Sequence, residues 1–245
     1  MIRSNKEILD AYHGNKYLSS EDINRLYEIE PDPWNLTGPR NLDTVQSILS
    51  VHKGLDEVDL MIDFGCGAGA WGLVTKAKEY CGIDQQSVLL EMKKKLPGAY
   101  GYVSPTSPTP EHLASIMGLM LQSGKVKKLS LIMCNSIYYL WRNPNPEVTR
   151  TNPTHQAGKI VEFLREFVNE YCAPNGVEQV TVFFGNSGPD IHNPSSKAAS
   201  TFKGEVENYT TDPFNSSHIE IGNIINQNEN PRWSGPLSYL VLEVN

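Results

Sequence analysis

The sequence predicts an α/β fold, in which a mostly parallel sheet carries helices on both faces. Short apolar runs alternate along the chain with longer stretches of helical periodicity, and this alternation is typical of βαβ units. One apolar run, 58–64, leads directly into three glycines at alternate positions and then into a helical pattern. No internal repeat or clear boundary divides the chain, so we expect a single domain over 1–245.

Composition and charge bound the function. With 245 residues, 39% hydrophobic and 20% charged, the chain is ordinary for a globular protein and long enough to bury a core. The net charge of -7 disfavours broad binding to nucleic acid, and we expect no DNA partner. The four cysteines show no C-x-x-C spacing, which favours reduced thiols and no metal site.

The location of the protein is predicted from what its sequence lacks. The first residues contain no apolar core of the kind found in a signal peptide. No run approaches the roughly 20 apolar residues that a membrane-spanning helix needs. We therefore expect a cytoplasmic protein with no membrane partner.

The first 57 residues precede the first strand and predict a helical segment. Helices are expected at 6–12, 21–29 and 42–51, with Ser20 as the N-cap of the second. Pro31 and Pro33 end the second helix, because a proline disfavours helical geometry in the residue before it.

The stretch that follows predicts a strand at 58–64, a tight turn and a helix at 70–79. Glycine suits such a turn because it adopts positive φ and lets the backbone approach a ligand closely. Gly65, Gly67 and Gly69 also satisfy the dinucleotide pattern G-x-G-x-x-G/A, which is weak when it stands alone. A plain βα turn with no ligand is the other interpretation.

Two acids discriminate between possible ligands of this turn. Asp63 comes just before the first glycine, where its carboxylate can face a cationic amine. Asp84 ends the next apolar run, 80–84, where it can accept hydrogen bonds from both hydroxyls of a ribose. Without a ligand, Asp84 would instead be a helix cap.

This arrangement of acid, glycines and acid resembles motifs I and II of the class I S-adenosylmethionine (SAM)-dependent methyltransferases. The resemblance implies a seven-stranded, Rossmann-like sheet with an N-terminal helical cover (1–57), a SAM-binding core (58–184) and a substrate-side part (185–245). It also implies that the backbone of Gly65, Cys66, Gly67 and Gly69 passes beneath the methionine part and ribose of SAM. On the same basis Asp84 holds the ribose, and the product is S-adenosylhomocysteine (SAH).

The segment before the turn adds a second, shorter resemblance. A tyrosine, then Asp32-Pro33-Trp34, then Arg40 precede motif I, and this order is similar to the nodulation N-methyltransferases, whose N-terminal segment folds over the SAM pocket. The resemblance implies that Trp34 and Arg40 contribute to the cofactor site, with Arg40 paired to the methionine carboxylate. A core anchor for Trp34 and a surface charge for Arg40 are the alternatives.

The remaining elements alternate as an α/β fold requires. A proline-rich loop is expected at 104–110 and a polar insertion, with a short helix at 201–209, at 185–216. The other helices are predicted at 87–96, 111–121 and from about 155 to 168, and the other strands at 99–103, 128–135, 180–184, 218–225 and 237–244.

Ligands of an open parallel sheet gather at the carboxyl ends of the strands, which places further candidates. We expect four residues that follow strand ends to contact the cofactor: Gln85, Ser104, Asn135 and Ser136. Substrate-side candidates are Tyr138, His155 and His192, although packing for the tyrosine and ordinary surface positions for the histidines are the alternatives. No spacing marks a catalytic base.

The predicted function is transfer of a methyl group from SAM to nitrogen or oxygen of a small-molecule acceptor. The segment after strand 128–135 lacks the Asn/Asp-Pro-Pro-Tyr pattern of nucleobase amine methyltransferases, and Asn135 stands where ribose 2′-O-methyltransferases have Asp. RNA, including a cap, stays an alternative acceptor, with the lysines of 93–95 and 125–128 as possible contacts. A non-catalytic partner subunit with the same fold is the second alternative. The acceptor, the methylated atom and the oligomeric state are not predicted.

Overall fold

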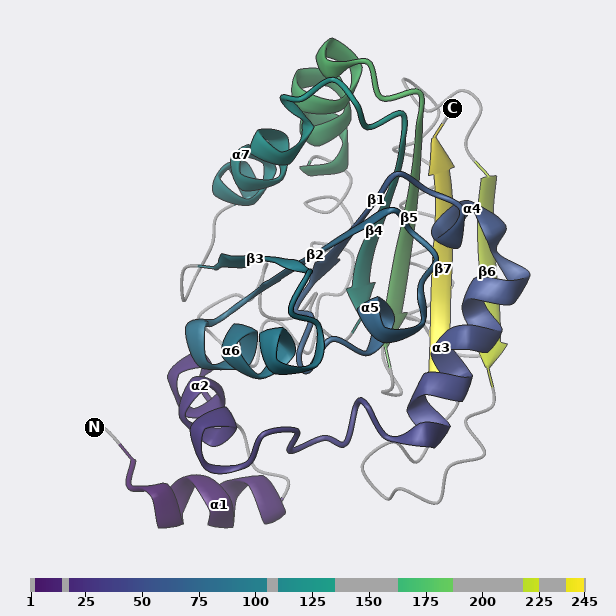
Figure 1. Cartoon of the computed structure of the whole chain (residues 1–245). Helices are drawn as coiled ribbons and strands as arrows, with labels where there is room; N and C mark the ends of the chain where they lie inside the picture. The colour runs from purple at the N-terminus through teal and green to yellow at the C-terminus, as the bar shows by residue number, and fades with distance from the viewer. Residues whose placement is uncertain are drawn as a thin grey trace, which may run out of the picture.

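A computed structural model of the chain describes residues 3–14, 18–104, 110–134, 163–186, 218–224 and 237–244. Its centre is a sheet of parallel strands flanked by helices (Figure 1), which confirms the predicted α/β, Rossmann-like class. The parallel strands are β1 (Leu60–Phe64), β2 (Glu79–Asp84), β3 (Tyr100–Val103), β4 (Lys128–Cys134) and β5 (Gln179–Asn186).

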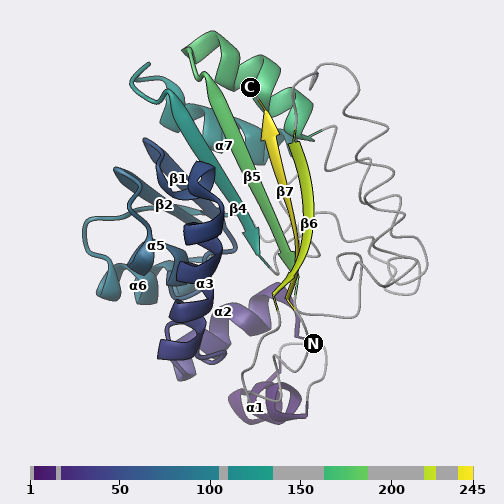
Figure 2. The same cartoon turned by 90° about the vertical axis from the view of Figure 1, so that its right-hand side faces the viewer.

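The strand order explains where a ligand can bind. The order is β3-β2-β1-β4-β5-β7-β6. β7 (Leu237–Val244) runs antiparallel to its two neighbours, β5 and β6 (His218–Ile224), so β6 has the same direction as β5. The chain leaves β1 towards β2 on one side and later returns to place β4 on the other side. The carboxyl ends of β1 and β4 therefore meet at a switch point, where open α/β sheets bind their ligands. Figure 2 shows the twist of these strands.

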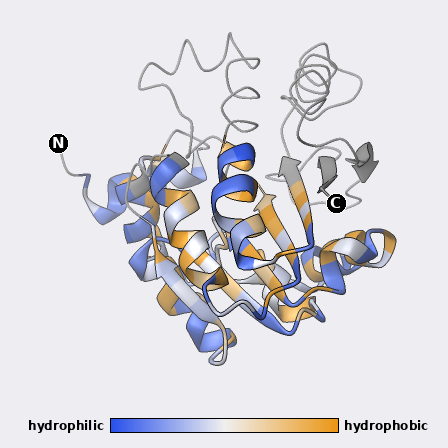
Figure 3. Ribbon diagram, turned by 90° about the horizontal axis from the view of Figure 1, so that it is seen from above, coloured by the Kyte–Doolittle hydropathy of each residue, from blue (hydrophilic) through white to orange (hydrophobic). Residues whose placement is uncertain are grey.

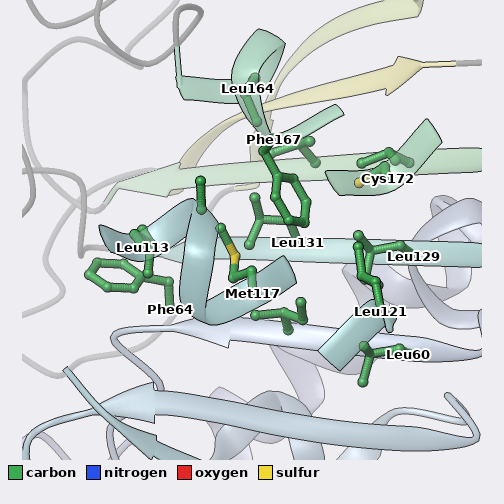
Figure 4. Packing of buried hydrophobic residues seen from close by; sticks show 14 of the residues in the cluster. Leu60, Phe64, Leu113, Met117, Leu121, Leu129, Leu131, Leu164, Phe167 and Cys172 are labelled. Carbon is green, nitrogen blue, oxygen red and sulfur yellow. The ribbon is translucent and has the colours of Figure 1, made fainter. Parts of the chain in front are cut away.

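Two hydrophobic clusters cover the two faces of the sheet. On one face α7 (Pro110–Leu121) and the segment around Phe167 pack on alternate residues of β1, β4 and β5. Figure 4 shows Leu113, Met117 and Leu121 packed among Leu60, Leu129 and Leu131. On the other face, helices α3 (Pro39–Val51), α4 (Lys53–Asp56), α5 (Ala70–Val74) and α6 (Gln86–Lys95) contribute to the second cluster. Figure 3 shows apolar strands between helices whose outer surfaces are polar.

The N-terminal helices begin with side-chain caps. Ser4 caps α1 (Asn5–His13) and Ser19 caps α2 (Ser20–Ile29), each in a capping box with the acid three residues later. The prediction of Ser20 as the N-cap is therefore wrong by one residue, because Asp22 completes a capping box with Ser19. Helix α3 begins at Pro39, earlier than predicted, since proline suits the first turn of a helix.

The helix after the glycines is shorter than predicted, and a distant carboxylate explains the difference. The prediction was 70–79, but α5 ends at Val74. Asp56, in the short helix α4, accepts hydrogen bonds from Thr75 Oγ1 at 3.0 Å and from the Lys76 backbone N–H at 2.7 Å. These bonds turn the chain away from the helix axis and towards β2.

A second helix departs from the predicted geometry near its end. The helix expected to run to residue 168 is α-helical over 163–166, becomes a π-helix at Phe167–Cys172, and ends in a 3-10 turn at Ala173–Asn175. Phe163 and Phe167 stack with their ring centroids 6.2 Å apart, and both are buried against the sheet. A helix with the length and hydrophobicity of a membrane-spanning segment is not found in the described residues.

Candidate cofactor site

The glycine turn joins β1 to α5 and has the backbone geometry that the sequence predicted. Gly65, Gly67 and Gly69 all have positive φ, at 71°, 53° and 86°. Other residues avoid this region because a side chain there crowds the backbone. The Gly65 N–H donates to the Ile83 carbonyl at 2.8 Å, which fixes the start of the turn against the end of β2.

Asp84 closes the turn from the end of β2. Its Oδ2 accepts a hydrogen bond from the Gly67 N–H at 3.0 Å, and its Oδ1 accepts one from the Gln85 N–H at 2.7 Å. Removal from water raises the pKa of Asp84 to about 6, although both hydrogen bonds act in the opposite direction. Because each carboxylate oxygen can accept two hydrogen bonds, Asp84 keeps accepting capacity for a ligand.

Asp63 is buried deeper than the sequence suggested. The residue is 1% exposed, and its Oδ2 accepts a hydrogen bond from the Tyr80 hydroxyl at 2.6 Å. Burial raises the pKa of Asp63 to about 7, while the Tyr80 hydrogen bond lowers it and the charge of Asp84 raises it further. Burial thus raises the pKa of both carboxyls, and the charge of Asp84 adds to the rise for Asp63.

The N-terminal cover reaches the glycine turn. A Cβ atom built on Gly67 would lie 2.6 Å from Leu36 Cδ1 and 3.1 Å from the Tyr27 hydroxyl. Trp34 packs edge-on against Tyr12, with ring centroids 5.7 Å apart, and at a tilt against Tyr27, at 5.8 Å. Trp34 is therefore an aromatic anchor of the cover, and its contact with a cofactor stays a prediction.

Polar contacts tie the cover to α6. The Ser87 N–H donates to Asn24 Oδ1 at 3.0 Å, and the Ser87 hydroxyl donates to Glu28 Oε1 at 2.9 Å. Lys95, at the other end of α6, donates to the Thr37 hydroxyl and lies 3.4 Å from Asp32 Oδ2. In Figure 1 α2 and α6 lie side by side, so the cover is attached at both ends of the helix that follows Asp84.

The other predicted residues within the described chain take different places. The Ser104 N–H donates to the Asp84 carbonyl at 2.8 Å, which brings these two candidates together. The Cys66 side chain faces α6, with its sulfur 3.8 Å from that of Met92, so Cys66 offers only its backbone to a ligand. Arg40 is exposed in the first turn of α3. The candidates outside the described residues are Asn135, Ser136, Tyr138, His155 and His192.

Sequence reasoning missed Tyr27, Leu36 and Tyr80. The first two approach Gly67 only through tertiary packing, which leaves no local pattern. Tyr80 could have been found only from the strand register, which pairs it with Met61, two residues before Asp63 on the same face of β1.

Comparison with known proteins supports the same fold. No protein-family model matches this sequence, and no curated protein matches it. Among solved structures, the plantazolicin methyltransferase BamL in complex with SAH and a triazolic desmethylPZN analog has a TM-score of 0.54 at 12% identity, covering 96% of this chain and 93% of BamL. The chain has the class I methyltransferase fold.

Two further structures have lower scores. The Bacillus cereus O-methyltransferase in complex with SAH has a TM-score of 0.47 at 7% identity, over 100% of this chain and 93% of that one. A candidate O-methyltransferase from Nostoc punctiforme PCC 73102 has a TM-score of 0.46 at 11% identity, and the match covers 84% of this chain but 57% of that one.

Proposed function

We propose that the protein is a SAM-dependent methyltransferase, which moves the methyl group of SAM to nitrogen or oxygen of a small-molecule acceptor by in-line displacement. One observation carries the proposal: Asp63, one residue before the end of β1, and Asp84, the last residue of the neighbouring strand β2, lie at the switch-point edge, and the positive-φ glycine turn lies between them. Two carboxylates at that edge favour a cofactor that carries positive charge and a ribose.

The residues present fit SAM group by group. Asp84 accepts from the ribose hydroxyls, and the backbone of the glycine turn passes beneath the ribose and methionine part. Asp63 supplies negative charge for the amine, and Ser104, bonded to the Asp84 carbonyl, lies on the adenine side. SAM supplies a methyl group that its sulfonium has already activated, so alignment and exclusion of water are what the chain must add.

The cover fits the requirement for exclusion of water. Tyr27 and Leu36 approach the glycine turn, and both are held by contacts of α2 and of the turn after it. A general base is required only if the acceptor begins protonated. The predicted substrate-side residues Tyr138, His155 and His192 stay candidates for contact with the acceptor.

The bonding of one lysine tract favours a small acceptor over RNA. Lys93 donates to the Ala99 carbonyl, Lys94 pairs with Glu91, and Lys95 bonds to the cover. These ammonium groups lie in the last turn of α6, where the helix dipole favours positive charge, and they bind neighbouring groups of the protein. The tract therefore offers less free charge to phosphates than its sequence suggests.

Titration calorimetry and a transfer assay test the proposal. We expect SAM and SAH to bind and NAD not to bind, and we expect labelled methyl from SAM to appear in a fraction of small molecules. Absence of SAM and SAH binding by the folded protein would refute the proposal, and NAD binding would support a dinucleotide site. Binding without transfer to small molecules or RNA would indicate a non-catalytic partner subunit.

A further inference from the structure

Tyr80 and Asp63 form a buried phenol–carboxylate pair beside the proposed cofactor site. Tyr80 lies in β2 opposite Met61, and its hydroxyl reaches diagonally to Asp63 Oδ2 at 2.6 Å. The Tyr80 ring is 7% exposed and packs on α5, where a Cβ atom on Gly72 would lie 2.7 Å from the ring. Strand and helix therefore hold the hydroxyl in one position.

The surroundings of Asp63 make this one hydrogen bond important. Among the described residues, the groups that act on its charge are Tyr80 and Asp84, and Asp84 carries the same sign of charge. Three nearby thiols feel the charge of Asp63 but are themselves neutral, because burial raises their pKa values: Cys66 in the turn, Cys81 on β2 and Cys134 on β4. Cys81 packs on the opposite face of the sheet. A carboxyl removed from water in such surroundings becomes neutral unless a donor stabilises its ionised form.

We propose that Tyr80 is a positioning residue that aims the Asp63 carboxylate and favours its ionised form, and that it thereby sets the pH range over which the site binds a cationic cofactor. The inference rests on the proposed function, since SAM provides the positive charge. In this role Tyr80 acts through its hydrogen bond to Asp63 and needs no contact of its own with the cofactor or the acceptor.

The physical argument has two steps. A hydrogen bond to an ionised acceptor is stronger than one to its neutral form, so Tyr80 moves the Asp63 equilibrium towards the carboxylate. Only the carboxylate attracts the amine and sulfonium of SAM, and burial strengthens that attraction because little water screens it. Loss of the hydroxyl therefore moves the onset of cofactor binding to higher pH.

The Tyr80→Phe variant tests this, because it removes the hydroxyl and keeps the ring that packs on α5. Tyr102→Phe is the matched control, since Tyr102 lies on β3 and packs on the opposite face of the sheet. SAM affinity is measured by calorimetry between pH 6.5 and 8.5. Dividing the wild-type affinity by the variant affinity at each pH cancels the titration of the cofactor's own amine.

The expected ratio depends on pH in a way that a purely structural defect does not produce. If the hydroxyl contributes one pKa unit, Tyr80→Phe binds SAM roughly eightfold more weakly near pH 6.5 and less than about twofold more weakly near pH 8.5. The ratio for Tyr102→Phe should stay near one throughout. A Tyr80→Phe ratio that is constant with pH would overturn the proposal.

A second variant keeps the test decisive if Tyr80→Phe does not fold. Asp63→Asn removes the titrating group, so the wild-type affinity divided by the variant affinity should grow as pH rises through about 7, where the wild-type carboxyl ionises. A flat ratio for Asp63→Asn would contradict the role given to Asp63 and hence to Tyr80. Failure of the wild-type protein to bind SAM at any pH would instead refute the proposed function.

Discussion

The burial of Asp63 predicts that the protein without cofactor loses stability as pH rises towards neutrality. The pKa of Asp63 is 3.8 in an exposed chain and about 7 in the fold, so the folded state holds the proton more tightly. Between these values the folded chain binds more protons than the unfolded chain, and the free energy of unfolding therefore falls with increasing pH. Asp63→Asn removes this dependence, because an amide does not titrate and its oxygen still accepts from Tyr80.

The magnitude follows from the two pKa values. Each pKa unit corresponds to about 1.4 kcal/mol, so ionising Asp63 in the fold costs roughly 4 kcal/mol once the pH exceeds 7. Relative to wild type, Asp63→Asn should gain about 1.4 kcal/mol in free energy of unfolding for each pH unit from 5 to about 6.5. The gain levels off as the wild-type carboxyl ionises and reaches roughly 3 kcal/mol between pH 5 and 8.

Urea unfolding at half-unit steps of pH from 5 to 8 measures this difference directly. Asp43→Asn is the control, since Asp43 is exposed on α3 and its carboxylate stays in water. The same measurement on Asp43→Asn shows what an exposed Asp→Asn change contributes by itself, and the Asp63→Asn difference is compared with it at each pH. If the free energies of unfolding of Asp63→Asn and wild type differ by the same amount at every pH, the reasoning from burial is wrong.

Two further substitutions test the glycine turn and the residue before β1, Asp59. Gly67→Ala places a Cβ atom on a residue with φ of 53°, 2.6 Å from Leu36 Cδ1. We expect SAM affinity to fall at least tenfold and the free energy of unfolding to fall by ~1–2 kcal/mol. Gly98 has open space around it, so Gly98→Ala is the control and should change neither quantity. Asp59 accepts from Lys78 at 2.7 Å, and this bond, with backbone donors, lowers its pKa to about 2. The Asp59 carboxylate therefore stabilises the fold fully above about pH 3.8, and this stabilisation is lost as pH falls through about 2. Asp59→Asn should lower the free energy of unfolding by roughly 1–2 kcal/mol at pH 7 and by much less near pH 2.

Local signals in the sequence predict the centre of the site. Asp63, the glycines and Asp84 each lie next to a strong apolar run, and the positive φ of Gly65, Gly67 and Gly69 follows from the turn that such a pattern requires. The structure confirms the positive φ of the three glycines, whereas the roles of Asp63 and Asp84 towards a cofactor stay predictions.

Features that depend on distant parts of the chain could not be predicted. Helix α5 ends early because Asp56 binds Thr75 and Lys76, and no periodicity within 70–79 contains that information. The partner of Asp63 depends on the register between β1 and β2, which a single sequence does not specify. The approach of Leu36 to Gly67 depends likewise on how the cover docks.

The central claim is that SAM binds at the turn between β1 and β2, with its ribose on Asp84. Calorimetric titration of SAM into wild type and Asp84→Ala at pH 8 tests this claim most directly, and circular dichroism confirms that both are folded. We predict saturable binding by wild type and at least tenfold weaker binding by Asp84→Ala, because a charged acceptor for the ribose hydroxyls is lost. Equal affinity of the two proteins for SAM, or no binding by folded wild type, would contradict it.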